Sequence, residues 1–308
     1  MEQNKLNGTL ETAEKPEQNG PEKPIAQAIN AAHAGLHPDK LIEEAKQAAA
    51  YYSVETHVQS GCRIGVGTGS TAVFVIQCLA ERYRDGLLKD IRCVPTSFQS
   101  RHLIIEAGLP ITDLEQLPFL DVCIDGADEV DPHLNCIKGG GGALAQEKIV
   151  MACSEKFIVV GDYRKRQKHL GARFQYLPLE VLPVAYMPLK RRIEKLEGGR
   201  CELRMALRKA GPVITDNGNY VLDWHFERLS SSLEALRALN LRLLQMPGIV
   251  ETGLFIDCVD AAYFGMPDGS VCELDRAKIG LRPTTCSITN SDCAECAEWG
   301  GTTVVKAR

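Results

Sequence analysis

The sequence has no apolar run near the ~18 residues that cross a bilayer, and its N-terminal segment lacks the apolar core of a secretory signal. It also has no excess of positive charge, since 35 lysines and arginines face 40 aspartates and glutamates. The formal net charge of −5 gives no general basic surface for nucleic acid or anionic membranes. These absences favour a cytoplasmic protein with no nucleic-acid partner and no membrane partner.

Several patterns that carry catalytic or metal chemistry are also missing. No Gly-X-Ser-X-Gly segment provides the nucleophile of a hydrolase, and the seven histidines form no metal-binding spacing. Near the C-terminus, Cys286, Cys293 and Cys296 offer three thiols, but no histidine follows His225 and a zinc site needs four ligands. The twelve cysteines form no paired framework, which is typical of reduced thiols in a cytosolic protein. We therefore expect no metal site and no disulfide scaffold.

Residues 1–36 have little to bury, and no aromatic residue precedes Tyr51. Such a segment cannot offset its ordering entropy, so we expect a disordered N-terminal extension. From residue 37 to residue 175, short apolar runs alternate with segments of helical periodicity. The expected strands are Arg63–Gly67, Ile91–Pro95, Leu120–Ile124 and Phe157–Val160, and the expected helices are Thr71–Tyr83, Gln99–Ala107 and Ala143–Ala152. Nearly all-apolar strands separated by helices indicate an α/β fold with an open, mostly parallel (Rossmann-like) sheet and helices on both faces.

After Pro178 this rhythm loosens, and residues 176–252 are typical of a smaller α+β (ferredoxin-like) domain. Its expected strands are Val181–Tyr186, Glu202–Leu207 and Tyr220–Asp223, and its expected helices are Leu189–Leu196 and Leu233–Gln245. We expect Gly253–Val259 to return the chain to the first sheet, so that residues 37–175 and 253–275 form one catalytic α/β domain. Residues 276–308 lose periodicity and predict a poorly ordered tail.

Open α/β sheets bind ligands in the loops at the C-terminal ends of their strands, and three such loops are chemically unusual. The first is Gly65–Thr71, where glycines allow close backbone approach and the following helix offers N–H groups to an anion. A serine stands where a dinucleotide fingerprint has its third glycine, and the lysine of a Walker loop is absent. The loop therefore favours a phosphate monoester, the alternative being a tight turn with a serine cap.

The second loop, Asp125–Asp131, holds four acids within seven residues directly after a strand. Neighbouring carboxylates raise one another's proton affinity, as general acid–base chemistry requires. The same cluster could bind a hard cation such as Mg²⁺ through its oxygens, or form a solvated acidic turn.

The third loop has Lys138 followed by four glycines and an apolar helix. Close approach to a small anionic ligand explains both the glycines and the lysine. The helix is apolar all round except at residues 146–148, so its charged side chains are either paired inside the core or functional. The pattern alone does not choose between Glu147 and Lys148.

Together these loops resemble the signature blocks of type A ribose-5-phosphate isomerases, the animal members in particular. The resembling blocks are GVGTGSTA (65–72), DGADEVDP (125–132), KGGGGALAQEK (138–148), TDNGN (215–219) and MPGIVETGLF (246–255). The resemblance implies interconversion of D-ribose 5-phosphate and D-ribulose 5-phosphate through a cis-enediolate, in the non-oxidative pentose phosphate pathway. It further implies a homodimer or homotetramer that needs no cofactor.

The resemblance also implies roles for individual residues. Glu147 corresponds to the proton acceptor, Lys138 stabilises developing charge, and Asp125 and Asp128 open the sugar ring and relay protons. The implied substrate-binding residues are Thr68, Gly69, Ser70, Thr71, Gly126, Ala127, Gly139, Gly140, Gly141 and Lys165. A further lysine of the family's first helix is matched most nearly by Lys46, offset by one residue.

Three alternatives stay open on the sequence. One is another enzyme of related architecture, such as an amino-sugar phosphate isomerase or a CoA transferase. A second is a sugar-phosphate sensor without catalysis, which could dispense with Glu147. A third is a Mg²⁺-dependent enzyme that uses the acidic loop and loses activity in a chelator.

Overall fold

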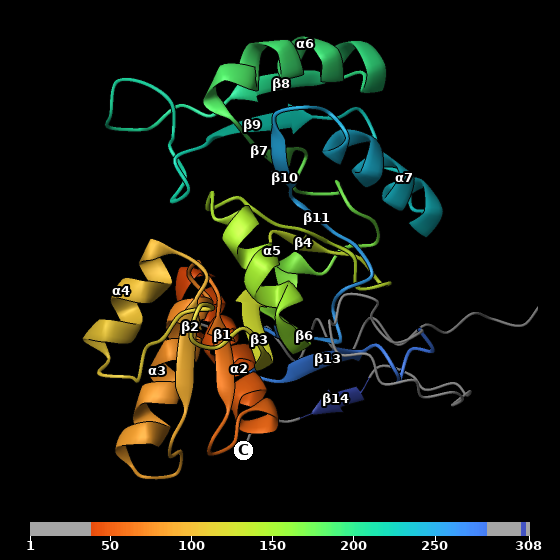
Figure 1. The fold of residues 1–308 in the computed structure, drawn as a ribbon. Helices are drawn as coiled ribbons and strands as arrows, with labels where there is room; N and C mark the ends of the chain where they lie inside the picture. The colour runs from red at the N-terminus through yellow and green to blue at the C-terminus, as the bar shows by residue number, and fades with distance from the viewer. Residues whose placement is uncertain (1–37, 282–302, 306–308) are drawn as a thin grey trace, which may run out of the picture. The chain divides into compact units, whose positions relative to one another are not determined.

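Seven strands form the largest sheet of the computed structural model, in the order β14-β13-β12-β6-β3-β1-β2 (Figure 1). They are β1 (Arg63–Val66), β2 (Arg92–Pro95), β3 (Leu120–Gly126), β6 (Ser154–Asp162), β12 (Ala261–Gly265), β13 (Val271–Asp275) and β14 (Thr303–Val305). The first five run parallel to one another, β13 pairs antiparallel with β12, and β14 pairs antiparallel with β13. The expected mostly parallel sheet is therefore confirmed.

The structure describes residues 38–281 and 303–305. The expected N-terminal extension at 1–36 and the three cysteines near the C-terminus lie outside the described residues. Of the segment 276–308, expected to be poorly ordered, residues 276–281 are described and residues 303–305 pair with β13.

Helices cover both faces of this sheet, as expected. They are α2 (Pro38–His57), α3 (Ala72–Arg84), α4 (Phe98–Glu106) and α5 (Leu144–Ala152). Because side chains alternate along a strand, Ile64 and Val66 pack in one core cluster with α2 and α3. Cys123 faces the other way and packs with Val150 and Met151 of α5. The apolar character of α5 thus reflects its burial against the sheet.

A separate antiparallel sheet has the order β10-β7-β9-β8. It consists of β7 (Leu177–Val181), β8 (Arg200–Leu203), β9 (Tyr220–His225) and β10 (Ile249–Thr252), with α6 (Tyr186–Glu197) and α7 (Leu233–Leu244). The chain order strand–helix–strand–strand–helix–strand, with the fourth strand beside the first, is the ferredoxin-like arrangement. The expected smaller α+β unit is therefore present. The boundaries of the two domains stay a prediction.

Two expectations in this region are wrong. Of the strand expected at Val181–Tyr186, only Val181 lies in a strand, as the last residue of β7. Pro183–Ala185 form a 3-10 helix and Tyr186 begins α6, because proline favours a helix start and cannot donate in a sheet. The segment expected to rejoin the main sheet at Gly253–Val259 instead contributes β11 (Leu254–Phe255) to a third, small sheet with β4 (Glu129–Val130) and β5 (Cys136–Ile137). The chain rejoins the main sheet at β12.

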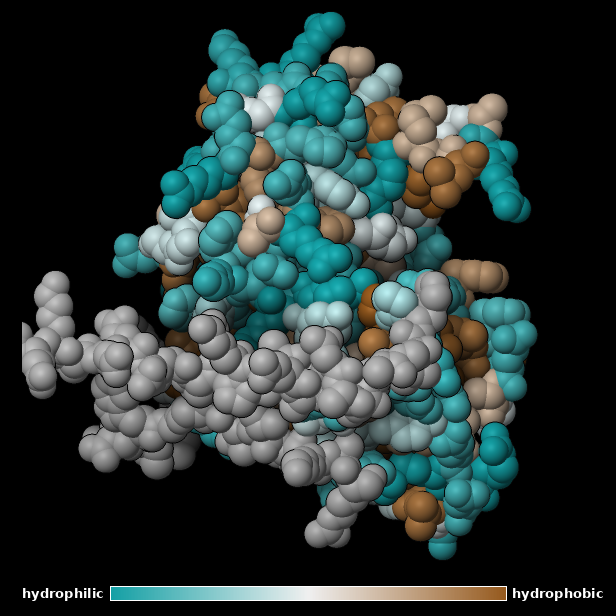
Figure 2. Space-filling view, turned by 180° about the vertical axis from the view of Figure 1, so that it is seen from behind, coloured by the Kyte–Doolittle hydropathy of each residue, from teal (hydrophilic) through white to brown (hydrophobic). Residues whose placement is uncertain are grey.

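None of the described helices is long and apolar enough to cross a membrane. On the face in Figure 2, the coloured atoms are mostly hydrophilic, and hydrophobic side chains stand in small separate groups. The nine described cysteines are free thiols, and eight are buried. Burial raises the pKa of Cys93 to about 12, which keeps its thiol protonated and unreactive.

Candidate active site

The main sheet reverses its strand order between β1 and β3, and the loops that follow these strands meet at that point. In open α/β sheets such a switch point is where ligands bind. The first loop comes very close to the second at Gly67, where a Cβ atom would lie 2.0 Å from Oδ1 of Asp125. Only glycine therefore fits at position 67, and the glycines of the first loop permit this contact.

Asp125 lies at the centre of the site and is fully buried. Its Oδ1 accepts hydrogen bonds from the backbone N–H of Thr68 at 2.9 Å and of Gly126 at 2.7 Å. Its Oδ2 accepts one from Nζ of Lys138 at 2.9 Å. Both oxygens are thus occupied, and Asp125 joins the first two loops to the lysine of the third.

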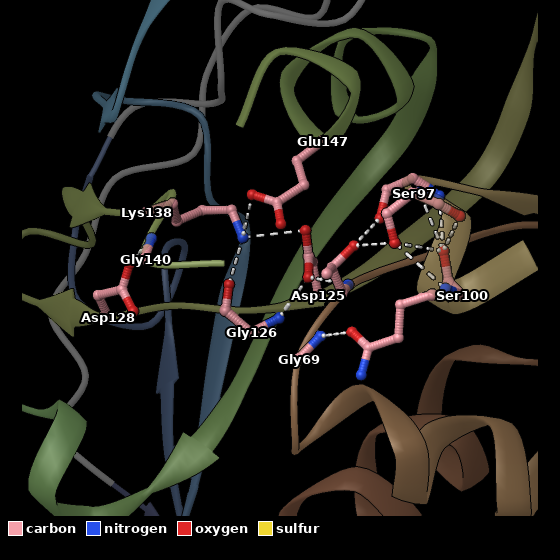
Figure 3. A network of polar contacts seen from close by, with 12 residues as sticks. Gly69, Ser97, Ser100, Asp125, Gly126, Asp128, Lys138, Gly140 and Glu147 are labelled. Carbon is pink, nitrogen blue, oxygen red and sulfur yellow. Dashed lines mark hydrogen bonds and ion pairs between the residues drawn. The ribbon is translucent and has the colours of Figure 1, made fainter. Parts of the chain in front are cut away.

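Lys138 and Glu147 lie next to each other in this buried site (Figure 3). Nζ of Lys138 lies 3.2 Å from Oε2 of Glu147 and also donates to the carbonyl oxygen of Gly126. The ion pair lacks hydrogen-bond geometry at Oε2, which is buried and accepts no hydrogen bond from the described residues. That oxygen is consequently an available proton acceptor.

The charges of the site shift two pKa values. Burial, reinforced by the negative charge of Asp125, raises the pKa of Glu147 to about 8, although Lys138 opposes the shift. Burial acts against the charged form of Lys138, but the carboxylates of Asp125 and Glu147 outweigh it and raise the pKa of the lysine above its usual range. The site therefore combines a carboxyl group able to exchange a proton near neutral pH with a permanent positive charge.

Asp128 lies at the more open side of the site. Its Oδ2 accepts a hydrogen bond of 2.7 Å from the N–H of Gly140, and a Cβ atom at Gly140 would lie 2.6 Å from Oδ1. The glycine loop thus packs against this carboxylate. Gly141 faces the first loop, since a Cβ there would lie 3.8 Å from Cγ2 of Thr68.

Hydroxyl groups line the first loop. Oγ1 of Thr68 hydrogen-bonds to the hydroxyls of Thr96 at 2.8 Å and Ser97 at 2.7 Å. Ser70 is exposed and Thr71 is buried at the start of α3, where the Thr71 side chain makes no capping hydrogen bond. An uncapped helix N-terminus with neighbouring hydroxyls can bind an anion.

The remaining expected residues are placed less centrally. Lys165 ends a 3-10 helix, Tyr163–Lys165, that follows β6, and it has no ion pair among the residues described. Ala127 is half-buried and packs against the core cluster beneath α5. Lys46 is paired with Glu43 of its own helix at 2.6 Å. Nothing in these contacts links Lys46 to the site.

The acidic loop does not form the single cluster expected from its sequence. Glu129 is buried and accepts the backbone N–H groups of Gly171 and Arg173, while Asp131 accepts the N–H of Asn135 at 2.8 Å. Two of the four acids in this loop therefore hold backbone N–H groups in place. Within residues 38–281, no three His, Cys, Asp or Glu side chains form a potential metal site.

Lys148 points away from Glu147 and towards the small sheets. Its Nζ donates to Oε1 of Glu251 at 2.8 Å and to the carbonyl of Thr252 at 2.7 Å. The sequence pattern does not choose between Glu147 and Lys148, but in the structure only Glu147 faces the site.

Comparisons with known proteins agree with this geometry. Residues 92–269 match the family described as ribose 5-phosphate isomerase A (phosphoriboisomerase A). A probable ribose 5-phosphate isomerase of Caenorhabditis elegans is 54% identical over 237 residues, which cover 77% of this chain and 94% of the relative. The chain belongs to the ribose 5-phosphate isomerase A family.

Other members of the family are similarly close. The Homo sapiens ribose-5-phosphate isomerase is 50% identical over 74% of this chain and 72% of its own length. A solved D-ribose-5-phosphate isomerase in complex with phospho-erythronic acid has a TM-score of 0.72 at 40% identity, covering 76% of this chain and 99% of that one. Membership of this family removes the alternative of an amino-sugar phosphate isomerase or CoA transferase.

Three side chains around the site are not predicted from the sequence. Thr96 and Ser97 follow β2, the neighbour of β1, and their position at a strand end was the available signal. Arg204 follows β8 and donates to the carbonyl oxygens of Gly139 and Gly140. No local pattern marks Arg204, because it reaches the glycine loop from another sheet.

Proposed function

We propose that this chain interconverts D-ribose 5-phosphate and D-ribulose 5-phosphate, an aldose–ketose isomerisation of the non-oxidative pentose phosphate pathway, with Glu147 as the base. Membership of the family supports the activity. The observation that carries the assignment of the base is the buried Glu147 carboxylate, 3.2 Å from the Lys138 ammonium, with one oxygen that accepts no hydrogen bond from the part of the chain that the structure describes.

The reaction moves one proton between C2 and C1 of the sugar through a cis-enediolate. Glu147 removes the proton from C2 and returns it to C1 on the same face. Its raised pKa, about 8, suits a group that both accepts and donates near neutral pH. A base in this position contributes on the order of 10²–10⁴ in rate.

Negative charge develops on the O1 and O2 oxygens as the proton leaves C2. Lys138 is fixed by Asp125 and Gly126, so its charge is oriented before the substrate arrives. Together with N–H groups of residues 139–141, it would stabilise the enediolate. Removal of one such donor typically costs ~3–4 kcal/mol in the transition state.

We assign ring opening to Asp128. Both oxygens of Asp125 already accept hydrogen bonds in the buried centre, whereas Asp128 is half-exposed and has one oxygen available beside the glycine loop. Asp125 then positions Lys138 and takes part in the proton relay through that lysine.

The phosphate of the substrate would bind at Ser70, Thr71 and the N-terminus of α3, with Thr68 and Gly69 completing the loop. Lys165 follows β6 at the same edge of the main sheet and would add a positive charge for the phosphate. Binding the phosphate away from the reacting carbons supplies energy that fixes the sugar for proton transfer.

The reaction is an internal redox exchange, so it needs no external oxidant or reductant, and Lys138 supplies the positive charge that a metal would otherwise bring. We therefore propose an enzyme without cofactor or metal that acts in the cytoplasm as a homodimer or homotetramer. The resemblance to the family supports the assembly.

Incubation of the purified protein with ribose 5-phosphate in D₂O and EDTA tests the function. We expect ribulose 5-phosphate to form, with deuterium at C1. Binding of phospho-erythronic acid without turnover would instead indicate a sensor. Turnover that disappears in EDTA and returns with Mg²⁺ would indicate the metal-dependent alternative.

A further inference from the structure

The Arg204 guanidinium connects the antiparallel sheet to the glycine loop of the site. Its Nε and Nη2 donate to the two carboxylate oxygens of Asp223, at 2.8 and 2.5 Å. Its Nη1 donates to the carbonyl oxygens of Gly139 at 3.0 Å and Gly140 at 3.1 Å. The Arg204 and Asp223 side chains are only 15% and 13% exposed, so the guanidinium is held firmly.

One peptide unit relates Arg204 to Asp128. The carbonyl of Gly139 and the N–H of Gly140 belong to the same peptide; the carbonyl accepts from Arg204, and the N–H donates to Oδ2 of Asp128 at 2.7 Å. Gly139 has a φ of +100°, a conformation that glycine adopts freely and leaves easily. The Gly139 carbonyl also accepts a hydrogen bond of 2.9 Å from the N–H of Gly142, which alone would hold it if Arg204 were removed. The peptide would then be held less firmly and could rotate enough to withdraw its N–H from Asp128.

We propose that Arg204 is a positioning residue for ring opening. It fixes the Gly139–Gly140 peptide, and this peptide orients the Asp128 carboxylate towards the sugar ring. The bond from the guanidinium also polarises the peptide, which makes the Gly140 N–H a stronger donor. This inference rests on the proposed function, because it gives Arg204 a role in the step assigned there to Asp128.

The chain offers a matched control for a merely structural ion pair. Arg242 of α7 makes the same two-bond contact with Glu197, at 2.8 and 2.7 Å, but touches no part of the glycine loop. Arg242→Ala should therefore leave kcat/KM unchanged. Arg204→Ala should lower kcat/KM for ribose 5-phosphate on the order of 10- to 100-fold, as expected when a reacting group is misplaced.

A double-mutant cycle separates positioning from general damage to the fold. If Arg204 acts through Asp128, Arg204→Ala should cost less than about threefold in an Asp128→Asn background, because coupled residues are not additive. In a Ser70→Ala background the full loss should remain. Equal losses in the wild-type and Asp128→Asn backgrounds would overturn the proposal. Arg204→Lys, which keeps the charge but not the planar donors, should show a partial loss if the alanine variant does not fold.

A partial reaction keeps this test distinct from that of the proposed function. Ribulose 5-phosphate carries phosphate on O5 and cannot close a ring through that oxygen, so deuterium exchange at its C1 requires Glu147 but no ring opening. We expect Arg204→Ala to retain this exchange within about threefold while it loses turnover of the aldose. Exchange that falls as far as turnover would overturn the role in ring opening. Absence of exchange in the wild-type protein would instead refute the proposed function.

Discussion

Nζ of Lys138 lies 3.2 Å from Oε2 of Glu147, and the two side chains are 3% and 6% exposed. Such a buried pair is a weak source of stability, because removing two charges from water offsets their attraction. Here Asp125 adds a second carboxylate against the same ammonium. The single positive charge of Lys138 therefore lies beside two buried carboxyl groups and cannot fully stabilise the negative charge of both. As a result the pKa of Glu147 is raised.

The activity should depend on pH through this carboxyl group. Glu147 must be ionised to accept the C2 proton, so kcat/KM should fall as pH drops below the raised pKa of about 8. A pH profile of kcat/KM from pH 5 to pH 10 measures it. An acid limb near the ordinary glutamate value of 4.5 would contradict the raised pKa of Glu147.

The stability of the protein should fall as pH rises, whereas kcat/KM should increase. Folded Glu147 keeps its proton up to about pH 8, whereas in the unfolded chain it loses it near 4.5. Between these values the unfolded state binds fewer protons, so stability falls as pH rises through this window. Glu147→Gln removes this effect, and its gain in Tm over the wild type should be larger at pH 9 than at pH 5.

The exposed Glu155 provides the control for this measurement. Glu155→Gln should give a Tm difference that hardly changes with pH. A difference for Glu147→Gln that is equally flat would contradict the raised pKa.

The two neighbouring lysines should separate stability from catalysis. Lys148→Met leaves Glu251 without its cation at a site where the two side chains are 17% and 21% exposed, so unfolding should become easier by about 1–3 kcal/mol while kcat changes little. Lys138→Met should lower kcat on the order of 10²–10³-fold. Urea unfolding and steady-state kinetics of both variants check this, and a greater loss of kcat in Lys148→Met would reverse the assignment.

Gly67 should tolerate no side chain. A Cβ atom at this position would lie 2.0 Å from Oδ1 and 2.5 Å from Cα of Asp125, so Gly67→Ala must displace β3 backbone. We expect a loss of at least ~1–3 kcal/mol in the free energy of unfolding. At Gly126 the nearest atom to a Cβ would be 3.6 Å away, so Gly126→Ala should be nearly neutral in the same unfolding experiment.

The sequence predicted four strands of the main sheet, β1, β2, β3 and β6, because they are nearly all-apolar and helices follow them at regular intervals. It did not predict the strands β12, β13 and β14 of the same sheet. It did not predict β4, β5 and β11, since a two-residue strand has no periodicity to detect. The strand expected at Val181–Tyr186 does not continue past Val181, because Pro183 begins a 3-10 helix there although the segment is apolar.

For the site, the sequence identified the three loops but not the full arrangement of their side chains. Residues near one another in the chain, such as Glu147 and Lys148, differ only in which way they point, and that depends on partners far away in sequence. Arg204 is the extreme case, because it reaches Gly139 from a different sheet. Such long-range contacts leave no mark in local composition.

Solvent deuterium exchange at C1 of ribulose 5-phosphate by Glu147→Gln tests the role of this carboxyl group most directly. The glutamine side chain has nearly the same size but cannot accept the proton, so exchange should fall on the order of 10²–10⁴-fold. Ribulose 5-phosphate should still bind with near wild-type affinity. Exchange at close to the wild-type rate in this variant would contradict the assignment of Glu147 as the base.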